Sequence, residues 1–237
     1  MIVPSDKDCK ETKLIKQGKA FLNPDFQPLA DWINKEYEVK VLNIYYDTPK
    51  SVHNKPFPRL NIIFEHLEEE LKFRDGFLGN FQSDKQQIIA TKFDELVNNQ
   101  TKESGFFDRL LNKKNVTKFD TKKLLVIIDA FKPVARDEAN ENISQAEIDK
   151  LKVELNNPDI WEISRFFAAT TFFFYTGSQV ELAKSNGYVE QLTDKYFKLL
   201  KRHDQFNYFD GNTFSISVDC KENFDNNFES NWYYYYK

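Results

Sequence analysis

Two short runs of apolar residues most constrain what this chain can fold into. Residues 124–128 read Leu-Leu-Val-Ile-Ile and residues 172–175 read Phe-Phe-Phe-Tyr, so neither run alternates apolar with polar positions. Strands that are buried on both faces have this pattern, whereas a strand with one solvated face alternates. We therefore expect the two runs to lie side by side in the interior of one β-layer, with helices above and below it.

Four further segments have the composition of strands. Residues 39–47 and 59–65 are rich in β-branched and aromatic residues, and a loop with three prolines separates them, so we expect them to pair as a hairpin. Residues 214–218 and 232–236 are expected to close the chain as two more strands. Residues 68–73 suit either a short strand or a helix, because Glu and Leu favour helices.

Helix starts are the clearest local signals. Three serines precede an acidic or amide residue at the spacing of a capping box, in which each side chain bonds the other's backbone amide. These pairs are Ser83 with Gln86, Ser144 with Glu147, and Ser178 with Glu181. Apolar residues from Phe26 to Ile33 predict a further helix that ends before residue 39, and Asn157 with Pro158 predicts the start of a short one.

The order of these segments predicts the fold class. Strand, helix and strand recur through the second half of the chain, which favours a layered fold over a helix bundle or a barrel. We expect an α/β or α+β fold with a single mixed β-sheet of about six strands and helices packed on its faces. Residues 1–20 are expected to form a charged, flexible leader and residues 21–237 one globular domain. No internal repeat is apparent, and the charged stretch 98–123 is the one candidate insertion.

Charge and cysteine content limit the classes of partner and compartment. The chain has 33 basic and 37 acidic residues, a net charge of −4, so no overall field attracts it to nucleic acid or anionic lipid. No apolar stretch approaches the roughly 20 residues of a membrane-spanning helix. We therefore expect neither a nucleic-acid nor a membrane partner. Only two cysteines and no secretory signal at the start favour a cytoplasmic location.

Several expected strands end in an ionisable residue. Asp47, Glu65 and Asp129 stand at such ends, and His66 follows Glu65. The carboxyl ends of parallel strands meet at one edge of a sheet, where a divalent cation and a phosphoester substrate can bind. A metal-dependent phosphoester hydrolase that uses these four residues is therefore our alternative interpretation. Two arguments weigh against it, because Asp is also common in turns and antiparallel strands would send the ends to opposite edges.

The C-terminal segment is the most distinctive part of the chain. It ends in Trp232 and four successive tyrosines, in a sequence that already holds 23 Phe and 11 Tyr. Tyr and Trp are enriched in binding hot spots because they combine apolar area with a polar tip. We expect about half of these rings to pack in the core and the others to face a surface or groove. Trp232, Tyr233 and Tyr235 are the predicted binding residues.

The sequence contains no catalytic motif that is specific enough to indicate a reaction. Our leading interpretation is therefore a non-catalytic, cytosolic module that binds a protein or a ligand through an aromatic-rich surface or groove, without a cofactor. The excess of acidic residues favours a basic protein as the partner.

Overall fold

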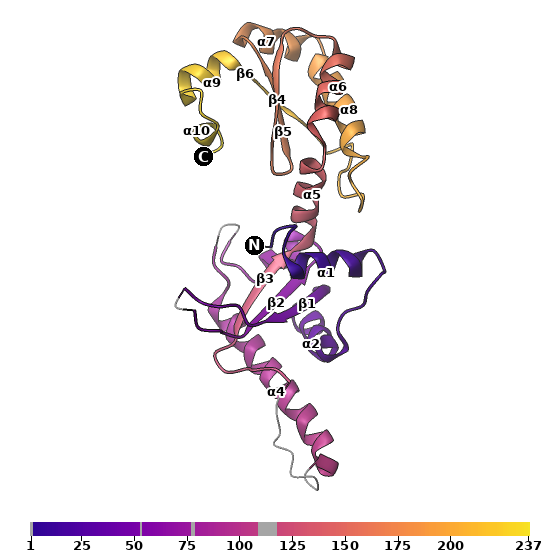
Figure 1. Ribbon diagram of the computed structural model, residues 1–237, viewed down its shortest axis with the longest axis vertical. Coiled ribbons are helices and arrows are strands. Elements are labelled where there is room, and N and C mark those ends of the chain that lie inside the picture. The colour runs from indigo at the N-terminus through magenta and orange to yellow at the C-terminus, as the bar shows by residue number, and fades with distance from the viewer. Residues whose placement is uncertain (1, 53, 77–78, 109–117) are drawn as a thin grey trace. The chain divides into compact units, whose positions relative to one another are not determined.

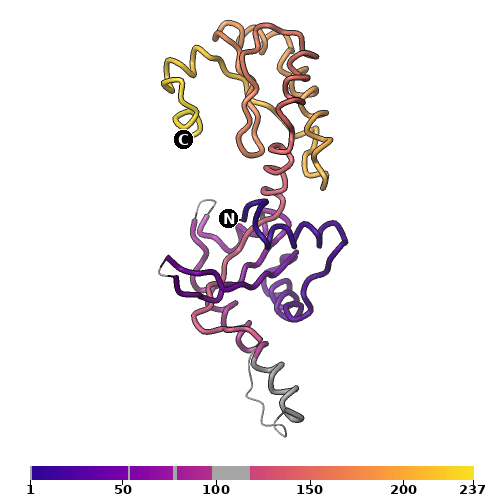
Figure 2. The backbone as a smooth tube through the Cα atoms, viewed as in Figure 1, coloured from indigo at the N-terminus to yellow at the C-terminus, as the bar shows by residue number. Residues whose placement is uncertain are grey.

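The chain divides into two compact units, and each has its own sheet. The computed structural model describes residues 2–52, 54–76, 79–108 and 118–237, and it describes the side chains of α4 only as far as residue 97. Unit 1 is Met1–Lys132 and unit 2 is Pro133–Lys237, and the chain passes from the first to the second within one helix (Figures 1 and 2). The predicted mixture of helices and strands is confirmed, but the single sheet of about six strands is wrong, because two three-stranded sheets form instead.

In the described residues of unit 1, four helices and a short 3-10 helix accompany the sheet β1-β2-β3. β1 pairs with β2 antiparallel, which confirms the predicted hairpin, and β2 pairs with β3 parallel. Its elements are α1 (Lys7–Lys16), η1 (Pro24–Phe26), α2 (Gln27–Tyr37), β1 (Val41–Asp47), β2 (Arg59–Phe64), α3 (Leu67–Leu71), α4 (Ser83–Asp108) and β3 (Leu125–Ala130).

The two faces of this sheet differ in character. Side chains alternate along a strand, so Ile44, Ile62 and Ile128 face one side and pack against α2 and α4. Asn43 and Asn61 alternate with them and face the side that α1 covers, because Thr12 and Asp8 of that helix bond them. The first twenty residues, expected as a flexible leader, thus contain a helix whose Asp8, Cys9 and Thr12 are buried.

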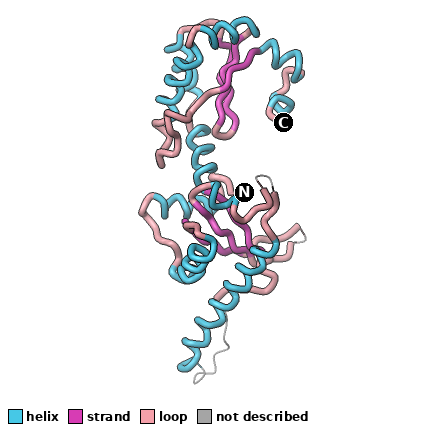
Figure 3. The backbone as a smooth tube through the Cα atoms, turned by 180° about the vertical axis from the view of Figure 1, so that it is seen from behind, coloured by secondary structure: helices cyan, strands magenta, loops and turns pink. Residues whose placement is uncertain are grey.

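Unit 2 is built in the same way around the sheet β4-β5-β6 (Figure 3). β4 pairs with β5 antiparallel, and β5 pairs with β6 parallel. Its elements are α5 (Phe131–Glu141), which begins at the boundary, α6 (Gln145–Leu155), β4 (Ile160–Phe166), β5 (Ala169–Phe174), α7 (Gly177–Ser185), α8 (Tyr188–Leu200), β6 (Ser217–Cys220), α9 (Lys221–Phe228) and α10 (Trp232–Tyr235).

The two units share details beyond strand order. In each, the helix before the hairpin ends in a left-handed residue, Glu38 or Asn156, and the hairpin register shifts next to its first pair. A capping box starts the helix after the second strand in both units. The last strand of each carries an aspartate one residue before its end, Asp129 or Asp219. The structure therefore reveals a repeated plan that the sequence analysis did not find.

The two apolar runs are both strands, but they are not neighbours. β3 is an edge strand of the first sheet and β5 is the central strand of the second, so the expectation that they lie side by side is wrong. The sequence of β3 is apolar along its length although only one edge of the strand is paired. The reason is that α4 covers one face of β3 and the other face lies on the side of α1.

Other local predictions have mixed outcomes. The helix expected near Phe26–Ile33 is present, as is the capping box of Ser144. Residues 68–73 lie in and after helix α3, and Asn157 and Pro158 precede strand β4 and not a helix. Residues 232–236, expected as a strand, form the short helix α10 and its end. Part of the candidate insertion, residues 109–117, lies outside the described residues. No described helix has the length and apolar character that crossing a bilayer requires.

Candidate functional site

The C-terminal rings lie over one face of the second sheet, and the backbone fixes them there. Glu229 and Ser230 both have positive φ, which ends α9 and reverses the chain. The side chain of Asn231 then caps α10 by accepting a hydrogen bond from the amide of Tyr233 at 2.9 Å. A capped helical turn overrides the strand preference of four tyrosines.

Some of these rings belong to the packing of the unit. The Tyr235 hydroxyl donates to Asp219 Oδ2 at 2.7 Å, and its ring meets that of Phe173 with centroids 5.1 Å apart. Burial raises the pKa of the Tyr235 phenol, and the hydrogen bond to Asp219 raises it further. Trp232 stacks on Trp161 with ring planes 8° apart. The structure therefore places Tyr235, a predicted binding residue, against the sheet.

Other rings face solvent and form what we call the aromatic surface: Phe166, Phe167, Trp232, Tyr233 and Tyr234. Their exposed fractions are 41 %, 56 %, 37 %, 67 % and 46 % in that order. Phe166 and Phe167 form the tip of the β4–β5 hairpin, where Phe166 stacks on Tyr236 with centroids 4.4 Å apart. Tyr236 in turn stacks on Trp232 at 5.9 Å, so ring contacts connect the hairpin tip with α10.

A groove adjoins Trp232. Its volume is about 380 Å³, and its walls include Glu141, Glu162, Arg165 and Trp232. Arg165 donates to the backbone oxygens of Asn140 and Ile143, whereas Glu162 pairs with Lys152 at 2.8 Å. Because Lys152 offsets the charge of Glu162, Glu141 is the carboxylate of this groove that has no ion pair among the described residues, and it lies in the same groove as the Trp232 indole.

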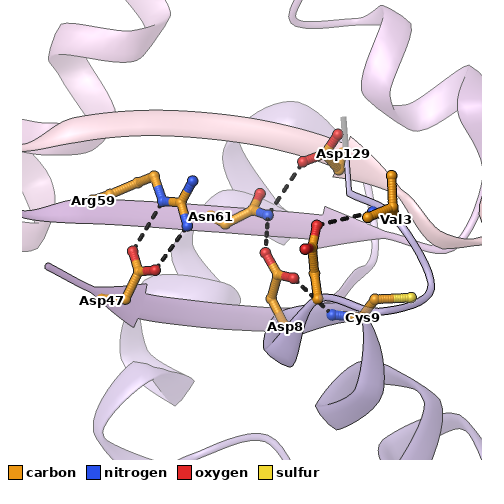
Figure 4. A network of polar contacts seen from close by, with 8 residues as sticks. Val3, Asp8, Cys9, Asp47, Arg59, Asn61 and Asp129 are labelled. Carbon is orange, nitrogen blue, oxygen red and sulfur yellow. Dashed lines mark hydrogen bonds and ion pairs between the residues drawn. The ribbon is translucent and has the colours of Figure 1, made fainter. Parts of the chain in front are cut away.

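The strand-end residues of the hydrolase interpretation lie in unit 1. Asp47 accepts two hydrogen bonds from Arg59, at 2.9 and 2.7 Å (Figure 4). Glu65 pairs with Lys16 at 2.5 Å, and His66 Nε2 lies 3.9 Å from the Glu65 carboxylate. The backbone amide of His66 is bonded by Glu69, which completes the capping box of α3.

Asp129 lies far from Asp47. It is 3 % exposed and accepts hydrogen bonds from the backbone amide of Ile2 and from Asn61. Burial raises the pKa of its carboxyl, and the bond from Asn61 opposes that shift. Asp47 pairs with Arg59 across the hairpin while Asp129 pairs with Ile63, four residues or about 13 Å further along β2.

The four residues therefore do not form one constellation. Asp47 and Asp129 line one pocket, which does not include Glu65 or His66. No three His, Cys, Asp or Glu side chains within the described ranges converge as a metal site. The antiparallel pairing of β1 with β2 sends Asp47 to the edge opposite to that of Glu65, His66 and Asp129, which stand at one edge because β2 and β3 are parallel.

The sequence analysis missed the hairpin part of the aromatic surface and the polar face of unit 1. Phe166 and Phe167 stand next to each other before two alanines, a pair that a turn between strands exposes. Asn43 and Asn61 are polar residues inside otherwise apolar strands, which could have indicated a polar sheet face. A comparison of the chain with known proteins finds no matching family model, curated protein or solved structure.

Proposed function

We propose that the protein is a recognition module whose aromatic surface binds a partner protein. One observation carries the proposal: five large ring-bearing residues on the hairpin tip and α10 are between 37 % and 67 % exposed. A scattered apolar residue at a surface is ordinary, but several exposed rings on two adjoining segments mark an interaction site. Phe, Tyr and Trp also supply a large share of the binding energy at protein interfaces.

The surface is held in place before any partner arrives. The Asn140 side chain donates to the backbone oxygens of Phe167 and Ala169 at 2.7 and 3.1 Å, which fixes the hairpin tip. The Tyr236 hydroxyl donates to Ser164 Oγ at 2.7 Å, which fixes the end of α10 on β4. Rigid rings lose little entropy on binding, so this order favours affinity.

The groove beside Trp232 indicates the chemistry of the partner. The exposed Glu141 attracts a basic side chain, and the partly exposed ring of Trp232 offers apolar area beside it. The proposed partner therefore presents an Arg or Lys next to an apolar side chain. The proposal requires no cofactor, and a cytoplasmic location agrees with the two buried free thiols, Cys9 and Cys220.

Two substitutions test the proposal against a matched control. Phe167 has a φ of 52°, and Asn tolerates this left-handed conformation, so Phe167→Asn removes the ring without straining the turn. Tyr233→Ala removes the most exposed ring of the surface. Tyr175→Ala is the control, because this ring is 47 % exposed in the same unit but lies at the other end of β5.

The full chain and its three variants are used to capture proteins from the native cytosol, and the captured protein is then purified for affinity measurement. We expect Phe167→Asn and Tyr233→Ala each to weaken binding by about tenfold or more, and Tyr175→Ala to leave it unchanged. Equal affinity for the wild type and both surface variants would refute the proposal.

A further inference from the structure

The groove beside Trp232 runs along the outer edge of a strand. β4 comes first in the strand order β4-β5-β6, so it pairs with β5 alone. Four successive residues of β4, 162–165, line the groove together with Trp232, and all of them belong to unit 2. The second sheet therefore has an edge without a neighbouring strand directly beside the aromatic surface.

The hairpin register shows which backbone groups of β4 point away from β5. A turn of two residues, 167–168, joins the strands, and the residues that flank such a turn exchange both of their backbone hydrogen bonds. Bonded and non-bonded pairs then alternate, so Ser164 turns its amide and carbonyl toward β5, whereas Ile163 and Arg165 turn theirs outward. The Ile163 amide agrees with this assignment, because it donates to Glu162 Oε1 at 2.7 Å.

Three of the outward groups have no hydrogen-bond partner among the described residues. They are the carbonyl of Ile163 and the amide and carbonyl of Arg165. The outer edge of β3 in unit 1 differs, because the Gln86 side chain donates to the Val126 carbonyl there at 2.6 Å. A strand edge with unbonded amides and carbonyls is a template on which another strand can form.

The two sides of this edge differ in chemistry. Trp232 packs on Phe173 and so lies on the face of the sheet that α10 covers. The neighbouring Phe172 faces the other way, into the core to which Ala139 of α5 belongs. Glu141 is the last residue of α5, so it borders the groove on the face opposite to Trp232. Side chains alternate along a strand, so an added strand has one set against Trp232 and the other toward Glu141.

We propose that the partner adds an extended segment to the edge of β4, as a fourth strand of the second sheet. This mode rests on the proposed function, because it describes how the same region of unit 2 holds its partner. The main chain of the segment bonds the outward groups of Ile163 and Arg165. Its apolar side chains contact Trp232, and an Arg or Lys between them lies toward Glu141, so the segment alternates apolar with basic or polar residues.

The probe is a blocked pentapeptide, acetyl-Val-Arg-Val-Thr-Val-amide, whose binding to the isotopically labelled full chain is followed by NMR. Two analogues keep every side chain: one is methylated on the amide nitrogens of its second and fourth residues, the other on those of its third and fifth. Each analogue loses the donors on one edge of the extended peptide. A peptide with Glu in place of Arg tests the charge. Glu141→Gln removes the charge of the groove, and Glu190→Gln removes one from an exposed position on α8.

We expect the probe to bind saturably and to slow the hydrogen exchange of the Arg165 amide, without effect on the Ser164 amide, which already faces β5. One methylated analogue should bind like the probe and the other at least about tenfold more weakly, because it lacks two hydrogen bonds. The peptide with Glu, and the probe with Glu141→Gln, should bind at least about threefold more weakly, whereas Glu190→Gln should leave the affinity unchanged.

Three results would overturn the proposal: no saturation by the probe, equal affinity of the two methylated analogues, or equal affinity of Glu141→Gln and Glu190→Gln. Protection of the Arg165 amide that grows with protein concentration in the absence of the probe would also overturn it, because a second copy of the chain would then occupy the edge. The proposed function is judged separately. If Phe167→Asn and Tyr233→Ala lose the captured protein while both analogues bind alike, the aromatic surface remains the binding site and only this mode is wrong.

Discussion

Two aspartates at equivalent positions of the two units have different hydrogen-bond partners. Asp129 and Asp219 both stand one residue before the end of the third strand. Asp129 is buried and bonded by Asn61, whereas Asp219 accepts from the amide of Cys220, from Asn223 and from Tyr235. The carboxylate position is thus common to both units, but the groups that bond it come from segments that differ between them.

At the same scale, Asp137 of α5 makes stability depend on pH. Burial raises the pKa of its carboxyl from 3.8 to about 6, although a hydrogen bond from the Ala168 amide opposes the shift. The folded state therefore holds this proton more tightly than the unfolded chain, and its contribution to stability falls as the pH rises from about 4 to about 6. We expect Asp137→Asn to raise the free energy of unfolding at about pH 7.5 by on the order of 1 kcal/mol, and by much less at about pH 4.

Urea denaturation of both proteins at the two pH values measures this difference. Asp149→Asn is the control, since it removes the same charge from an exposed position on α6. A gain from Asp137→Asn that is equal at both pH values, or equal to that of Asp149→Asn, would show that the buried carboxyl is not the cause.

Among the elements, the sequence predicted the presence of helix-capping boxes better than the residues that form them. Ser144 caps α6 through Glu147, as its spacing indicates. The box expected at Ser178 and Glu181 is formed two residues earlier by Thr176 and Gln179. Both pairs fit the same pattern, and the end of β5 at Phe174 decides between them, because the chain must leave the strand at Thr176.

Alanine substitutions distinguish the two possible caps. Thr176→Ala removes the hydroxyl that accepts from the Gln179 amide, so we expect it to lower the free energy of unfolding by about 1 kcal/mol. Ser178 is exposed and bonds only the Thr176 hydroxyl among the described residues, so Ser178→Ala should change it by less than about 0.5 kcal/mol. Thermal unfolding of the two variants compares them directly, and a larger loss from Ser178→Ala would mean that the sequence pattern had identified the correct cap.

Most strands were predictable, although β4 (Ile160–Phe166) was missed because a helix was expected after Pro158, and strand neighbours were not predictable. Periodicity identified 39–47, 59–65 and both apolar runs, because side-chain pattern depends on which faces are covered. It carries no information on which strand pairs with which, so β3 and β5 were assigned to one sheet. Periodicity also failed at Trp232–Tyr236, where the Asn231 cap and the ring contacts with Trp161 and Phe173 outweigh strand propensity.

For the molecule as a whole, the limits of the sequence are set by contacts between distant segments. Trp232 and Tyr233 were predicted as binding residues and are exposed, yet Phe166 and Phe167 join them only because the hairpin tip meets Tyr236. The pocket of unit 1 likewise needs Asp8 of α1 beside Asn61 of β2, 53 positions apart in the chain. Neither association follows from local spacing.

Two separate cores predict that the units fold separately. One core cluster contains residues of α2, α4 and the first sheet, the other contains residues of α5 to α8 and the second sheet, and the two clusters share no residue. Each unit has about 100 residues or slightly more, a size at which single domains commonly fold alone.

We therefore expect fragments 1–132 and 133–237, expressed separately, each to unfold in one cooperative thermal transition and to reproduce their part of the amide NMR spectrum of the full chain. Fragment 1–166 is the control, because it ends at the tip of the β4–β5 hairpin and leaves β4 without its partner. If fragment 133–237 lacks a cooperative transition while the full chain has one, the second core depends on residues of unit 1, and the division into two autonomous units is wrong.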